Sequence, residues 1–168
     1  MEFARRLDRQ TADAVTLEAG LLHGLTTPAF SEPERAAEEL RRAVGKYGLK
    51  SVTIASSAAG TPLDQPEFDK MFAICEELSL FIFMHPKSAG DRAELGDYTL
   101  LQLVGWPFET TLAVARMIYT GLFERRPDLK LFHSVAGEVQ RGHWLAGHAG
   151  RDNLTHPIPL TSYKFALI

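Results

Sequence analysis

A short apolar run, FIFM at residues 81–84, constrains the fold of this chain more than any other stretch. Such an unbroken run is typical of a strand buried on both faces, as in parallel sheets covered by helices. The run ends at His85 and Pro86. Because proline has no backbone N–H, a paired strand cannot continue through it. The sequence therefore predicts a buried strand that ends on an imidazole.

Strand-like and helix-like segments alternate along the rest of the chain. Further strands are predicted around residues 21–30, 49–57 and 127–137, and helices over 2–20, 31–48, 67–78, 99–105, 107–125 and 138–148. In the helix at 31–48, Ser31 can cap the start, Pro33 suits the first turn and Gly48 ends the helix. Parallel strands need helical crossovers, so about four strand–helix units predict an α/β fold with a parallel sheet.

Two architectures fit this alternation. One is an open, doubly wound sheet, and the other is part of a (β/α)8 barrel. The chain contains no G-x-G-x-x-G motif and no phosphate-binding loop, which disfavours a nucleotide-binding open sheet. A complete barrel takes about 250 residues, and only about half of its units are found here. We expect a single domain over residues 1–168, with an irregular tail at 154–168.

Composition excludes several classes of partner. With 168 residues and a hydrophobic fraction of 45%, the chain can build the core of one domain. A net charge of −3 offers no basic footprint for nucleic acid. Apolar runs are shorter than the ~20 residues of a membrane span, and the charged first ten residues do not resemble a secretory signal. The single cysteine, Cys75, suits a reducing cytoplasm.

Histidines end two of the predicted strands, His85 and His133. In parallel α/β proteins, active sites form where the carboxyl ends of the strands converge. A neutral imidazole there can bind a divalent metal or move protons, or its ring can simply hydrogen-bond a neighbouring loop. Glu138 is either a helix-start charge or a site carboxylate. Arg151 can grip a carboxylate with two hydrogen bonds, or lie on the surface.

Several segments in this order carry a family resemblance: "FIFMHP", "VGWPFETTLAVARMIYTGLFERRPDLKL" and "AGE". From about residue 3 to residue 153 the chain resembles the amidohydrolase-related decarboxylases, the group of aminocarboxymuconate semialdehyde decarboxylase and the resorcylate-type decarboxylases. The resemblance implies a metal-dependent (β/α)8 barrel that decarboxylates or hydrolyses a small, often aromatic, carboxylic acid. It also implies a homo-oligomer such as a dimer, because one family arginine reaches a neighbouring subunit's substrate.

The resemblance also implies roles for individual residues. His85 falls on a metal ligand for zinc or manganese, His133 and Glu138 are the catalytic candidates, and Arg151 is the candidate for binding the substrate carboxylate. The chain departs from the family pattern at Val135, which stands where the family has a histidine. The family's H-x-H pair and its last aspartate ligand have no counterpart, so the family pattern is truncated at both ends.

Two other functions stay open. One is a truncated, non-catalytic relative that self-associates through open sheet edges, with two copies supplying eight strands. The other is an independent open α/β binding module.

Overall fold

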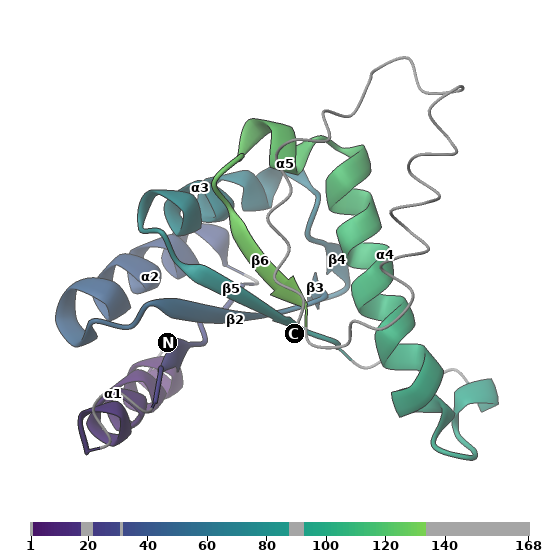
Figure 1. Cartoon of the computed structure of the whole chain (residues 1–168), viewed down its shortest axis with the longest axis horizontal. Helices are drawn as coiled ribbons and strands as arrows, with labels where there is room; N and C mark the ends of the chain where they lie inside the picture. The colour runs from purple at the N-terminus through teal and green to yellow at the C-terminus, as the bar shows by residue number, and fades with distance from the viewer. Residues whose placement is uncertain (1, 18–21, 31, 88–92, 134–168) are drawn as a thin grey trace.

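Four parallel strands form the main sheet. The computed structural model describes residues 2–17, 22–30, 32–87 and 93–133. The strands are β1 (Leu25–Thr26), β2 (Ser51–Ala55), β5 (Phe81–His85) and β6 (Lys130–His133), in the order β1-β2-β5-β6 (Figure 1). Each strand pairs in parallel with the one before it in the chain.

This strand order distinguishes between the two predicted architectures. A doubly wound sheet reverses its order at a switch point, whereas a barrel adds each new strand beside the previous one. The sheet grows in one direction through all four strands, and helices form the crossovers between them. The observed topology is therefore that of consecutive units of a barrel.

The helices follow the predicted segments closely. They are α1 (Glu2–Leu17), α2 (Pro33–Tyr47), α3 (Asp69–Glu77), α4 (Trp106–Tyr119) and α5 (Leu122–Arg125). The predicted end of α2 is confirmed, because Gly48 takes a left-handed φ of 65° and its N–H donates to the Val44 carbonyl at 2.9 Å. No helix of the described residues is both long and apolar enough to span a membrane.

The two faces of the sheet differ in burial. Alternate strand positions are at most 5% exposed and form a core with the helices: Val52, Ile54, Ile82, Met84 and Leu131. The other face carries partly buried aromatic rings. Phe132 stacks on Phe81 with ring centroids 6.1 Å apart and on Phe83 at 5.4 Å. The prediction that strand 81–84 is buried on both faces is therefore wrong for the described residues, since they cover the second face only partly.

Some short elements differ from the predicted pattern. The loop after β2 contains a small antiparallel hairpin, β3 (Ser57–Ala58) and β4 (Thr61–Pro62), which turns at Gly60 with a φ of 87°. A 3-10 turn, η1 (Pro66–Phe68), precedes α3, and another, η2 (Ala93–Leu95), follows the β5 loop. The predicted helix at 99–105 is a π-helical turn, η3 (Leu101–Gly105), that runs directly into α4.

Candidate active site

The carboxyl end of β5 is held in place by the end of β2. His85 is the last residue of β5, and its carbonyl accepts a hydrogen bond from the Ser56 N–H at 3.1 Å. The backbone N–H of Lys87 in turn donates to Ser56 Oγ at 3.0 Å. Ser56 is 4% exposed, whereas His85 is exposed. The turn after β5 is thus fixed to the buried scaffold while its imidazole remains accessible.

A single hydrogen bond determines which nitrogen of His85 is offered to a ligand. Nδ1 lies 2.9 Å from the Pro86 carbonyl oxygen. Since a carbonyl oxygen only accepts hydrogen bonds, Nδ1 carries the proton, and Nε2 of the neutral ring keeps the lone pair. A backbone carbonyl on the second nitrogen is the arrangement that orients metal-binding histidines.

An indole lies beside the imidazole. The ring centroids of His85 and Trp106 are 6.3 Å apart, with a tilt of 56°. Trp106 is the first residue of α4, where η3 ends, and π-helical turns are frequent at functional sites. Its carbonyl accepts a hydrogen bond from Thr110 Oγ1 at 3.2 Å, and Thr110 is fully buried. These contacts anchor an aromatic wall next to His85.

Sequence reasoning missed both Ser56 and Trp106. Ser56 could have been found, because it directly follows β2 and the register pairs Ala55 with His85. Trp106 is 21 positions after His85 in the printed sequence, and no spacing rule links the two. Only the fold brings them together.

Of the other predicted site residues, only His133 lies in the part of the chain that the structure describes. His133 is the last residue of β6, and the register pairs it with Met84, one position before His85. The two histidines therefore do not occupy paired positions, and a catalytic role for His133 remains a prediction. Glu138 and Arg151 lie outside the described residues.

The described residues do not form a metal site by themselves. They contain no group of three or more histidine, cysteine, aspartate or glutamate side chains placed to hold an ion. A catalytic zinc generally has three protein ligands, and a lone imidazole does not hold such an ion. His85 fits as one ligand, and the others would have to come from residues outside the described ranges or from another chain.

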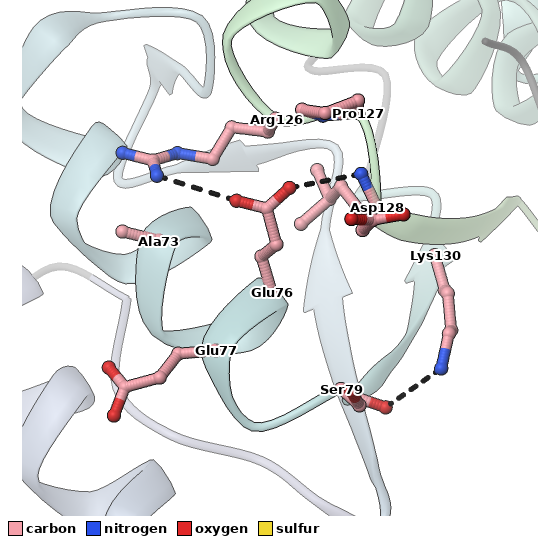
Figure 2. A pocket seen from close by; sticks show the side chains of 9 residues that line it. Ala73, Glu76, Glu77, Ser79, Arg126, Pro127, Asp128 and Lys130 are labelled. Carbon is pink, nitrogen blue, oxygen red and sulfur yellow. Dashed lines mark hydrogen bonds and ion pairs between the residues drawn. The ribbon is translucent and has the colours of Figure 1, made fainter.

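A cavity lies at the opposite end of the strands from His85. Figure 2 shows this cavity of about 490 Å³, between the end of α3 and the loop that leads into β6. Several of its polar groups contact one another: Glu76 accepts from the backbone N–H of Asp128 at 3.0 Å and lies 3.5 Å from Arg126. Lys130 donates to the Ser79 carbonyl at 3.5 Å. These contacts join the end of α3 to the loop that leads into β6.

Comparison with known proteins shows the family. Residues 1–146 match the family model described as Amidohydrolase. The chain belongs to the amidohydrolase family. The sequence prediction of an amidohydrolase-related chain is therefore confirmed.

Relatives of this amidohydrolase chain are decarboxylases by name. It is 33% identical over 137 residues to 2-amino-3-carboxymuconate-6-semialdehyde decarboxylase of Dictyostelium discoideum, covering 82% of this chain and 38% of the relative. It is 25% identical over 151 residues to gamma-resorcylate decarboxylase of Rhodococcus jostii, covering 82% of this chain and 46% of the relative. The chain thus spans less than half the length of these relatives.

Solved structures agree with the fold. The 5-carboxyvanillate decarboxylase of Sphingomonas paucimobilis matches 99% of this chain and 50% of its own, with a TM-score of 0.76 and 27% identity. The 5-carboxyvanillate decarboxylase of Novosphingobium aromaticivorans was solved with manganese. The match covers 95% of this chain and 49% of that enzyme, with a TM-score of 0.80 and 25% identity. The match to a 2,6-dihydroxybenzoate decarboxylase covers 95% of this chain and 53% of that enzyme, with a TM-score of 0.81 and 22% identity. The predicted partial (β/α)8 barrel is confirmed.

Proposed function

We propose that this chain carries the His85 side of a decarboxylase site for a small aromatic carboxylic acid. The observation that carries this proposal is the position of His85. It ends β5, is exposed, and keeps Nε2 available because Nδ1 donates to the Pro86 carbonyl. Decarboxylase relatives and neighbours support the reaction class.

Each feature of the site suits this substrate class. The partly exposed faces of Phe83 and Trp106 lie near His85 and can stack against a planar ring. A divalent ion such as zinc or manganese, with His85 as one of its ligands, would bind and orient the carboxylate. The candidates for the remaining roles are His133 and Glu138 for proton transfer and Arg151 for the carboxylate.

Activity of the 168-residue chain tests the proposal. The chain, supplied with Mn²⁺ or Zn²⁺, is incubated with 2,6-dihydroxybenzoate and with 5-carboxyvanillate, and carbon dioxide release is followed. We expect release with at least one acid, and a loss of at least about 100-fold in His85→Gln, because the ion would lose one of its ligands and even a lost partner of such a ligand commonly costs about 10- to 100-fold. His23→Gln is the matched control, because His23 is an exposed histidine before β1. Equal rates in His85→Gln and the parent chain would contradict the proposal.

Self-association through the sheet edges is a second candidate role. Among the described strands, β1 and β6 each have one neighbour, and the face that carries Phe81, Phe83 and Phe132 is only partly covered. Open edges and partly exposed aromatic faces favour association. If this role is correct, Phe132→Lys abolishes an oligomer detected by light scattering, and an unchanged oligomer argues against it.

A further inference from the structure

The alternating burial of β5 continues past its last residue to Lys87. Along residues 81–87 every second side chain is buried, and Pro86 is buried between exposed His85 and exposed Lys87. Ser56 holds this extension, because its N–H donates to the His85 carbonyl at 3.1 Å and its Oγ accepts from the Lys87 N–H at 3.0 Å. Successive side chains of an extended chain point to opposite faces, so Lys87 leaves the backbone on the same face as His85.

The Lys87 ammonium can reach the space beside the His85 imidazole. Positions two residues apart in an extended chain are separated by roughly 6–7 Å. The four-carbon stem of lysine is flexible and can span a distance of this order. A small carboxylic acid that lies at Nε2 of His85 is therefore within reach of a positive charge on the same face of the sheet.

Lys87 is the basic residue at this end of the sheet. In the described part of the chain, the connections that follow β1, β2 and β5 comprise residues 27–30, 32, 56–68, 86–87 and 93–105. Within them Lys87 is the only lysine or arginine. The same connections contain five acidic residues: Glu32, Asp64, Glu67, Glu94 and Asp97. An anionic substrate that passes these carboxylates needs a cation near His85, and Lys87 supplies it.

The charge of Lys87 is not used within the fold. Within the part of the chain that the structure describes, its ammonium makes no hydrogen bond or ion pair, and the residue is exposed. The buried carboxylate of Asp64 is held by Arg116 of α4 instead, from Nε at 2.7 Å and from Nη2 at 3.0 Å. The three N–H donors of the Lys87 ammonium are therefore available to an anionic oxygen.

We infer that Lys87 binds the acid group of the substrate and selects anionic rings over neutral ones. The inference rests on the proposed function and adds to it a binding residue distinct from Arg151. Carbon dioxide carries no charge, so an ammonium on the carboxylate stabilises the bound substrate at least as much as the transition state. Loss of Lys87 should therefore raise KM without lowering kcat.

Binding of 2,6-dihydroxybenzoate to the 168-residue chain, measured by nuclear magnetic resonance without added metal, tests the inference. We expect saturable shifts of the Lys87 side-chain signals, and binding at least about 10-fold weaker in Lys87→Met, the effect of one lost hydrogen bond to a charged group. Lys87→Arg, which keeps the charge, should restore most of the affinity. Lys50→Met is the matched control, because exposed Lys50 precedes β2 at the other end of the strands.

A neutral ligand shows whether charge is the cause. The amide 2,6-dihydroxybenzamide has the same ring without the carboxylate, so it should bind the parent chain and Lys87→Met equally. Absence of Lys87 shifts in the parent chain overturns the inference. Equal affinity of Lys87→Met and the parent chain for 2,6-dihydroxybenzoate overturns it as well.

Kinetics separate this inference from the proposed function. In the carbon dioxide assay with Mn²⁺, Lys87→Met should raise KM at least about 10-fold and leave kcat at or above the parent value. If the parent chain binds the acid at Lys87 and releases no carbon dioxide, the proposed function fails and the binding site stands. If release proceeds and KM is the same in Lys87→Met, the inference fails and the proposed function stands.

Discussion

At the scale of single residues, the fold depends on a few buried polar groups that the sequence pattern does not reveal. Asp8 and Glu39 are 0% and 2% exposed, and both carboxylates bind the Arg42 guanidinium, Asp8 at 2.7 Å. Burial raises the pKa of Asp8 against the opposing charge of Arg42. For Glu39, burial is outweighed by the hydrogen bond and charge of Arg42, so its pKa is lowered. The period of the helix alone cannot reveal these contacts, because they join α2 to Asp8 and Arg5 on α1.

Removal of Arg42 is expected to be severe. Arg42→Ala leaves two buried carboxylates without their shared cation, and losing one partner of a buried ion pair costs about 3–5 kcal/mol. Arg35→Ala is the control on the same helix, since Arg35 is 57% exposed and pairs with exposed Glu32, a contact worth at most about 1 kcal/mol. Urea unfolding measures both changes. Equal losses of stability in the two variants would show that the buried cluster of Asp8, Glu39 and Arg42 contributes no more than an exposed ion pair.

Cys75 gives a pH-dependent prediction. Burial raises the pKa of its thiol from 9.0 to about 12, and the residue is 0% exposed. Below pH 9 the thiol is protonated in both the folded and the unfolded chain. As the pH rises from 9 towards 12, only the unfolded thiol ionises, so the free energy of unfolding falls by up to about 1.4 kcal/mol per pH unit.

A thiol reagent provides the measurement. At pH 8 we expect Cys75 to react with Ellman's reagent only after unfolding in urea, and Cys75→Ala to remove the added loss of stability above pH 9. Rapid reaction of the folded chain would contradict the buried position of this thiol.

At the scale of secondary-structure elements, the sequence predicted the features that depend on residues close together in the chain. The proline in the first turn of α2 and the end of the helix at Gly48 follow from chain stereochemistry, and both were predicted, but the N-cap position is Glu32 and not the predicted Ser31. The β3–β4 hairpin and the π-helical turn before α4 were not, because they depend on contacts after the chain has folded. Residues 81–84 could not show that one sheet face is only partly covered, since an apolar run looks the same in both cases.

Alanine at Gly45, within α2, and alanine at Gly48, just after its end, should change the free energy of unfolding in opposite directions. Gly48→Ala places a side chain at a φ of 65° and is expected to cost about 1–2 kcal/mol. Gly45→Ala fills open space on the exposed side of the helix and should add about 0.5–1 kcal/mol. Urea unfolding compares the two with the parent chain. Destabilisation by Gly45→Ala would mean that this position is more crowded than the structure shows.

At the scale of the whole molecule, the order of the strands is the decisive feature. Sequence alternation predicted about four strand–helix units and left an open sheet and a barrel as alternatives; the order β1-β2-β5-β6 and the structural neighbours identify the barrel. The position of His85 at a strand end was predictable because Pro86 stops the strand. Its neighbours Ser56 and Trp106 were not, because the fold joins residues that are distant in sequence.

The most direct test of a ligand site at His85 is nuclear magnetic resonance of the chain titrated with Mn²⁺. Paramagnetic broadening falls off steeply with distance, so we expect the signals of the His85 ring and the Trp106 indole to vanish first. Signals of the Glu76–Arg126 cavity at the other end of the strands should persist, and His85→Gln should abolish the selective loss. Equal broadening at both ends, or an unchanged pattern in His85→Gln, would contradict a metal-binding role for this histidine.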